Sequence, residues 1–164
     1  MRRAIYAGSF DPFTFGHLSV ATNAARVFDE VRILIAVSPD KNYLFSQKER
    51  LELISKVISG FGNLSVDTTD GYVVAYGGAN DYRFMVRGIR NATDAVAEIT
   101  LAELNSAFAP NIQTVFLPAN PTLSEVSSSE LKRKFLAGEN ISLYCPPEVI
   151  RALESKRDKL EERV

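Results

Sequence analysis

The chain has 164 residues, of which 46% are hydrophobic and 24% charged, and its formal net charge is −1 at pH 7. This composition suits one domain with its own core. It excludes the global positive field that draws a protein to nucleic acid, so any anion site must be local. The single cysteine, Cys145, excludes a disulfide framework within the chain and favours a reducing, cytoplasmic setting. With neither a signal-peptide core nor an apolar window as long as a membrane span, we expect no membrane partner.

Five short apolar runs predict strands. They are rich in Val, Ile, Phe and Tyr, and they span residues 3–7, 31–37, 64–69, 82–87 and 113–119. Near-continuous apolar runs of this length are typical of strands that are buried on both faces of a parallel sheet.

Helical patterns lie between these strands and after the last one. Ser46 and Glu49 have the spacing of a capping box, in which a hydroxyl and a carboxylate satisfy the first free amides of a helix. Further helices are predicted after Ser127–Ser129 and from Pro146-Pro147. Apolar residues recur at helical spacing in 16–28, 47–58 and 92–108.

The resulting order, β-α-β-α-β-α-β-α-β followed by helices, predicts an α/β fold. We expect a Rossmann-like, doubly wound, five-stranded parallel sheet with C-terminal helices, in a single domain over 1–164. Ligands of such sheets bind beyond the carboxyl ends of the strands, where the strand order reverses. That rule selects the loops 7–17, 38–46, 87–91 and 118–129.

The first of these loops has the composition of a phosphate-binding turn. Gly8 has no Cβ and so lets a ligand approach closely, and Asp11-Pro12 favours a turn. Thr14 is placed to cap the following helix, and His17, the only histidine, falls in its first turn, where free amides favour phosphate. The alternative is an ordinary strand-to-helix turn whose histidine only packs.

The string GSFDPFTFGH, residues 8–17, resembles the G-[ST]-F-D-P-x-T-x-G-H signature of the nucleotidyltransferases that carry a T/HxGH motif. Three further motifs follow the predicted strands, namely SPDK (38–41), RGIR (87–90) and VSSS (126–129). Together, at these spacings, they resemble bacterial phosphopantetheine adenylyltransferases, and the resemblance runs from Arg3 to about Leu153.

The resemblance implies transfer of the adenylyl group of ATP to 4′-phosphopantetheine, giving dephospho-coenzyme A and pyrophosphate in coenzyme A biosynthesis. It also implies Mg²⁺ bridging the phosphates, coenzyme A as a feedback ligand, and a homohexamer. No dedicated metal site of side chains is visible in the sequence, which is usual for magnesium at nucleotides. The nucleophile is a phosphate oxygen that is already ionised, so catalysis needs positioning and charge stabilisation rather than a strong base.

The resemblance also assigns roles to residues. His17 is the catalytic residue and donates to the α-phosphoryl oxygens in the transition state. The implied ATP-binding residues are Ser9, Phe10, His17, Gly88, Ile89, Arg90, Glu98, Leu123, Ser124, Glu125, Val126, Ser127, Ser128 and Ser129. The implied phosphopantetheine-binding residues are Ser9, Lys41, Val73, Arg87 and Asn105. The residue types suit these roles, because guanidinium and ammonium groups bind phosphate oxygens.

The chain departs from the family pattern in the adenine pocket and at subunit contacts. The family usually carries a polar residue at the position of Phe15, and aromatic residues are frequent at the positions of Ala95, Ala97, Leu123 and Glu125. Two other readings therefore stay open: a transferase of the same superfamily with a different phosphorylated acceptor, and a non-catalytic module that binds a nucleotide or coenzyme A. The retained His17, Lys41, Arg87 and Arg90 count against the second.

Overall fold

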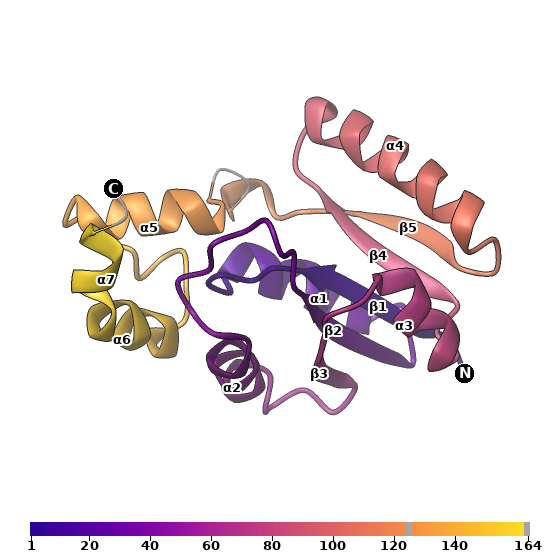
Figure 1. Cartoon of the computed structure of the whole chain (residues 1–164), viewed down its shortest axis with the longest axis horizontal. Helices are drawn as coiled ribbons and strands as arrows, with labels where there is room; N and C mark the ends of the chain where they lie inside the picture. The colour runs from indigo at the N-terminus through magenta and orange to yellow at the C-terminus, as the bar shows by residue number, and fades with distance from the viewer. Residues whose placement is uncertain (124–125, 163–164) are drawn as a thin grey trace.

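The structure is a computed structural model that describes residues 1–123 and 126–162. The described residues form one five-stranded sheet in the order β3-β2-β1-β4-β5, with every pair of neighbours parallel (Figure 1). Its strands are β1 (Arg3–Gly8), β2 (Glu30–Ala36), β3 (Leu64–Thr69), β4 (Phe84–Ile89) and β5 (Gln113–Pro118). The predicted doubly wound fold is confirmed, and the strand order reverses between β1 and β4.

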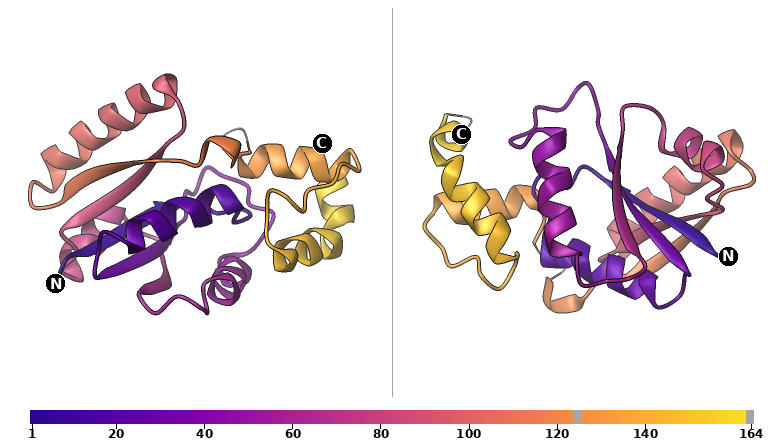
Figure 2. Two further views of the ribbon diagram at one scale, coloured as in Figure 1. Left: turned by 180° about the vertical axis from the view of Figure 1, so that it is seen from behind. Right: turned by 90° about the horizontal axis from the view of Figure 1, so that it is seen from below.

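Helices cover both faces of the sheet. Those of the sheet region are α1 (Phe15–Ala25), α2 (Gln47–Val57), α3 (Val73–Ala79) and α4 (Ala92–Phe108). After the 3₁₀ turn η1 (Pro121–Leu123) come α5 (Ser128–Leu136), α6 (Pro147–Ser155) and α7 (Arg157–Glu161). Figures 1 and 2 show these last three gathered beside the sheet, at the end of the molecule away from α3 and α4. Among the described helices, none is long and apolar enough to cross a membrane.

The core follows from the alternation of side chains along the central strands. Tyr6 and Ile33 belong to a cluster on the face covered by α1 and α2, whereas Ile5 and Leu34 belong to a cluster that packs against α3. A third cluster joins the C-terminal helices to Leu44 and Phe45 of the loop that follows β2. That loop is therefore anchored at its end in a core of its own.

The predicted boundaries of the fourth strand were wrong by two residues. Tyr82 is buried and apolar, but it packs against α3 and donates its hydroxyl to Glu30 at 2.6 Å rather than joining the ladder. Strand β4 continues instead through Arg87 and Gly88 to Ile89, which pairs with Pro118. Arg87, Gly88 and Ile89 of the RGIR motif therefore belong to strand β4, and only Arg90 lies in the loop that follows. Helix α3 fills the crossover from β3 to β4, where a helix was predicted without bounds.

Helix α4 forms where the sequence predicts it, but none of its residues is buried. Its apolar stripe is exposed: 66% at Val96, 46% at Ile99, 56% at Leu104 and 83% at Phe108. In Figure 1 the helix lies beside β4 and β5, with one long side facing away from the sheet. A stripe of this size on an exposed helix marks a surface that suits a protein contact.

Candidate functional site

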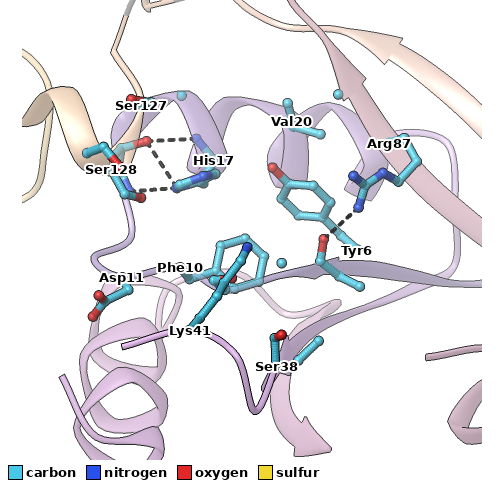
Figure 3. A pocket seen from close by; sticks show the side chains of 18 of the residues that line it. Tyr6, Phe10, Asp11, His17, Val20, Ser38, Lys41, Arg87, Ser127 and Ser128 are labelled. Atoms are coloured by element: carbon cyan, nitrogen blue, oxygen red, sulfur yellow. Dashed lines mark hydrogen bonds between the residues drawn. The ribbon is translucent and has the colours of Figure 1, made fainter. Parts of the chain in front are cut away.

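A cavity of about 980 Å³ lies at the carboxyl ends of the strands, where the strand order reverses between β1 and β4. All four loops selected by the sequence line it, and α5 closes one side. Figure 3 shows side chains from β1, α1, β4, α5 and the loop after β2 directed toward this space. Its position agrees with the rule for ligand sites in open α/β sheets.

His17 is held by the start of α1. The backbone N–H of Thr14 donates to His17 Nδ1 at 3.0 Å, and Thr14 Oγ1 accepts from the His17 backbone N–H at 3.3 Å, which completes a capping box. Because Nδ1 accepts this hydrogen bond, the neutral ring carries its proton on Nε2. The turn thus selects a tautomer that leaves an Nε2–H donor.

Aromatic rings surround the same imidazole. Phe10 meets it edge-on with ring centroids 5.1 Å apart, and Phe13 stacks on it at 5.5 Å. Burial is the main cause that lowers the pKa of His17 to about 4, and the positive charge of Arg90 acts in the same direction. His17 is therefore neutral at pH 7 and acts as an uncharged hydrogen-bond donor.

Gly8 has a packing role in the first loop. Phe10 has a left-handed backbone with φ of 50°, which is uncommon for a residue other than glycine. Its ring turns back over Gly8, where a Cβ would lie 2.9 Å from the ring Cζ. The missing side chain at Gly8 thus makes room for Phe10, which in turn packs on His17, and Gly8 also lines the cavity.

Arg87 is fixed by three hydrogen bonds. Its Nε and Nη2 donate to the two carboxylate oxygens of Glu98 at 2.6 Å each, and its Nη1 donates to the carbonyl of Ala7 at 3.1 Å. Burial lowers the pKa of Arg87, but the hydrogen bonds and charge of Glu98 outweigh it, so the net shift is upward. These contacts use three of the five N–H groups of the guanidinium and leave two for a further partner.

Arg90 has a comparable partner on the same helix. Its Nε and Nη2 donate to Asp94 at 3.3 and 3.2 Å, and the hydrogen bonds from Arg90 are the main cause that lowers the pKa of Asp94. Asp94 and Glu98 are one helical turn apart on α4. Two ion pairs therefore join α4 to the end of β4.

The loop that carries Lys41 is tied to the first loop through Asp11. The two carboxylate oxygens of Asp11 accept from the backbone N–H groups of Leu44 and Phe45 at 2.9 Å each. Lys41 itself is exposed, and Figure 3 shows its side chain reaching into the cavity. The ammonium group is thus carried by a loop whose far end is fixed.

Arg50 of α2 secures the other side of that loop. Its Nη1 donates to the Ser9 carbonyl at 2.7 Å, and its guanidinium lies 4.2 Å from the centre of the Tyr43 ring. The Tyr43 hydroxyl accepts from the Ser38 backbone N–H at 2.8 Å. Arg50 therefore fixes the first loop and the SPDK loop relative to each other.

The serines at the start of α5 divide their roles. Ser127 is the N-cap and accepts from the Glu130 backbone N–H at 3.1 Å, as a structural cap does. Ser128 donates its hydroxyl to the Pro12 carbonyl at 2.7 Å and so docks α5 on the first loop. Ser129 is exposed and lines the cavity.

Most residues that the resemblance assigns to the site are brought together. The cavity lining includes Ser9, Phe10, His17, Lys41, Val73, Arg87, Gly88, Arg90, Glu98, Leu123, Val126, Ser127, Ser128 and Ser129. Ile89 and Asn105 lie outside this lining, and the Asn105 amide contacts Met85 Sδ at 3.8 Å. Ser124 and Glu125 lie outside the described residues. The individual roles stay predictions.

Several residues of the site are not among those predicted from the sequence. Tyr6, Asp11 and Lys132 line the cavity, and Arg50 supports it from behind. Asp11 lies within the string GSFDPFTFGH, but its predicted role is only that of a turn residue. Lys132 follows Ser128 by one helical turn, and that spacing was the available signal.

Comparisons with known proteins show which families this sequence is similar to. A cytidylyltransferase-like family model matches residues 5–134. A phosphopantetheine adenylyltransferase of Clostridium novyi is 38% identical over 160 residues, covering 98% of this chain and 99% of that protein. One of Brucella anthropi is 41% identical over 95% of this chain and 98% of its own, and one of Synechococcus elongatus is 37% identical over 98% and 96%.

Proposed function

Because the chain belongs to the cytidylyltransferase-like family and, within it, to the phosphopantetheine adenylyltransferases, we propose that it transfers the adenylyl group of ATP to 4′-phosphopantetheine. The products are dephospho-coenzyme A and pyrophosphate, a step of coenzyme A biosynthesis. The observation that carries this proposal is the neutral His17, whose Nδ1 is held by Thr14 beside a cavity that also receives Arg87 and Lys41.

In this reaction an oxygen of the 4′-phosphate forms a bond to the α-phosphorus of ATP while the bond from that phosphorus to the pyrophosphate oxygen breaks. A phosphate monoester has its second pKa near 6, so the nucleophile is ionised at neutral pH. No side chain has to remove a proton. The work of the site is to hold two anions in line and to stabilise the charge that develops between them.

His17 would stabilise that charge through Nε2–H, aimed at a non-bridging oxygen of the α-phosphoryl group. A donor fixed in advance needs no reorganisation during the reaction, and one such donor is worth about 3–4 kcal/mol. The Thr14 contact supports this role because it fixes the tautomer. The depressed pKa supports it too, because His17 would donate a hydrogen bond without giving up a proton.

Cations would hold the two substrates. Arg87, with Lys41 and Val73, would bind the phosphate and the arm of phosphopantetheine, using the two N–H groups that Glu98 and Ala7 leave. Arg90 and the amides at the start of α5 would bind the ATP phosphates. Glu98 and the other ATP-binding residues implied by the resemblance would also contact the nucleotide.

Mg²⁺ would accompany ATP. Among the described residues, no group of three or more His, Cys, Asp or Glu side chains is arranged to hold a metal ion. That fits Mg²⁺ held mainly by phosphate oxygens and water, its usual arrangement with nucleotides. Bound there, the ion would neutralise charge on the phosphates, and Arg90 would share that task from the protein side.

The working form is proposed to be a cytoplasmic homohexamer that coenzyme A inhibits by occupying the same cavity. The exposed stripe of α4 supports assembly, since Val96, Leu104 and Phe108 present apolar surface that a second copy of the chain would cover. The arm that coenzyme A shares with phosphopantetheine supports the shared cavity.

A substrate panel separates this function from its alternatives. ATP and CTP are each incubated with 4′-phosphopantetheine and with other phosphorylated acceptors, namely NMN, glycerol 3-phosphate, choline phosphate and FMN, and products are identified by mass. Dephospho-coenzyme A from ATP alone is expected. Product from another acceptor only would assign a different transferase, and binding without any product would favour the non-catalytic module.

A further inference from the structure

Lys132 is a cation at the cavity that the family resemblance leaves without a role. It lies on α5, one turn after Ser128, and its side chain is 21% exposed. It is among the residues that line the cavity, together with Ser127, Ser128 and Ser129. The face of α5 that docks on the first loop therefore also directs an ammonium group to the site.

Asp11 fixes the position of this ammonium group. Lys132 Nζ lies 3.3 Å from Asp11 Oδ2, and Asp11 is the one acidic side chain within ion-pair distance of it in the described part of the chain. Both oxygens of Asp11 also accept backbone N–H groups, from Leu44 and Phe45. Because those amides hold the carboxylate in place and its side chain is 7% exposed, it cannot turn away from Lys132.

The charges at this point suit a phosphate. A buried carboxylate beside an anion site would repel the anion unless a cation compensates for it, and Lys132 supplies that cation. An ammonium group has three N–H donors, so the contact with Asp11 leaves two of them available. Lys132 can therefore join Asp11 and a phosphate oxygen at the same time.

We propose that Lys132 is a further ATP-binding residue, which donates to the β- or γ-phosphate, and that Asp11 is the residue that positions it. The inference rests on the proposed function, since it concerns the same substrate. It places the cation on the α5 side of the cavity, where the leaving pyrophosphate would be held, whereas Arg87 and Lys41 serve the acceptor.

The test compares Lys132→Met with Lys134→Met. Lys134 is on the same helix and is also 21% exposed, but it pairs with Glu139 at 2.7 Å on another side of α5. Binding of inorganic pyrophosphate is measured by calorimetry without turnover. Lys132→Met should weaken it about 10- to 100-fold, the usual effect of losing one charge-assisted hydrogen bond, and Lys134→Met should leave it unchanged. Equal affinities in the two variants would overturn the proposal.

Kinetics and a conservative variant separate binding from a structural role. Lys132→Met should raise KM for ATP more than KM for 4′-phosphopantetheine, and Lys132→Arg should recover most of the pyrophosphate affinity because it keeps the charge. If Lys132→Met unfolds, Lys132→Gln replaces it. An equal rise of both KM values in Lys132→Met, with no recovery of pyrophosphate affinity in Lys132→Arg, would mean that Lys132 only docks α5.

The same measurements distinguish a failure of this inference from a failure of the proposed function. Wild-type protein that binds pyrophosphate through Lys132 but forms no dephospho-coenzyme A would overturn the transferase proposal and leave the Lys132 site in place. Wild-type protein that forms the product, with pyrophosphate affinity unchanged in Lys132→Met, would do the reverse.

Discussion

The two sides of the cavity are built differently. On the β1–α1 side, the turn is buried and bonded to itself, with Thr14 1% exposed and Asp11 6% exposed. On the β4–α4 side, Arg87 and Arg90 meet carboxylates of a helix in which no residue is buried. The His17 side chain is thus fixed by the folded core, whereas Arg87 and Arg90 pair with carboxylates of a helix that has no buried residue.

This difference suggests that the β1–α1 turn is rigid within one chain, whereas the β4–α4 side would be completed by contact between copies of the chain. The turn must present one imidazole tautomer at one place, and its capping box and aromatic neighbours do that within a single chain. The opposite side presents two guanidinium groups whose partners, Asp94 and Glu98, belong to α4. Contact between copies along α4 would therefore also fix the positions of Arg87 and Arg90.

The largest effect is expected on the rigid side. His17→Ala should lower kcat by about 10²- to 10³-fold with little change in ATP affinity, because the donor acts mainly in the transition state. Steady-state kinetics and ATP binding measure the two quantities. Glu49→Ala is the matched control, since Glu49 holds the same position in the capping box of α2 as His17 does in that of α1. Equal losses of binding and turnover in His17→Ala would contradict the role.

A smaller and more selective effect is expected on the cation side. Arg87→Ala should raise KM for 4′-phosphopantetheine by about 10- to 100-fold and KM for ATP by much less, because charge-assisted hydrogen bonds to one substrate are lost. Arg90→Ala should show the opposite preference. Initial rates at varied concentrations of each substrate measure both. The reverse pattern would mean that the two arginines exchange roles.

The exposed helix provides a third test, of assembly rather than chemistry. Phe108→Asp places a charge in the apolar stripe of α4, so the mass measured by analytical ultracentrifugation should fall from that of a hexamer to a smaller species. Leu143→Asp is the matched control, because Leu143 is 71% exposed on the C-terminal segment. A wild-type monomer, or equal masses for all three proteins, would exclude α4 as a contact between copies.

The smallest effect concerns pH. Because the pKa of folded His17 is lowered to about 4 from a usual value of 6.5, the unfolded chain binds the proton first as pH falls. The free energy of unfolding therefore has its full contribution from His17 above pH 6.5 and loses it as pH falls from 6.5 toward 4. With one histidine in the chain, NMR should show a single Hε1 signal that stays constant from pH 8 to about 5 and moves near 4. A midpoint near 6.5 would mean that the imidazole is solvated.

Local signals made much of this predictable from the sequence. The apolar runs identified the sheet, and the capping box of Ser46 and Glu49 was visible because it lies within four consecutive residues. For the first helix the sequence indicated only the Thr14 cap, and the structure shows that His17 completes a capping box there. The strand end was predicted less well, because Tyr82 has the composition of a strand residue but its hydroxyl is taken by Glu30, 52 positions away. Local composition does not contain such a contact.

The supporting residues of the site could not be predicted for the same reason, because their contacts join residues that lie far apart in the sequence. Arg50 reaches Ser9 across 41 positions and Lys132 reaches Asp11 across 121. A charged residue on a helix is usually on its solvated face, so neither stood out. The apolar stripe of α4 was visible as periodicity, but periodicity does not say whether the chain itself or another copy covers it.

Pyrophosphate release from ATP, followed with and without 4′-phosphopantetheine, tests whether the chain transfers the adenylyl group to this acceptor and whether His17 takes part. We expect release that depends on the acceptor, one dephospho-coenzyme A for each pyrophosphate, and a rate about 10²- to 10³-fold lower in His17→Ala at saturating substrates. Release that does not depend on 4′-phosphopantetheine, or a His17→Ala rate equal to that of the wild type, would contradict it.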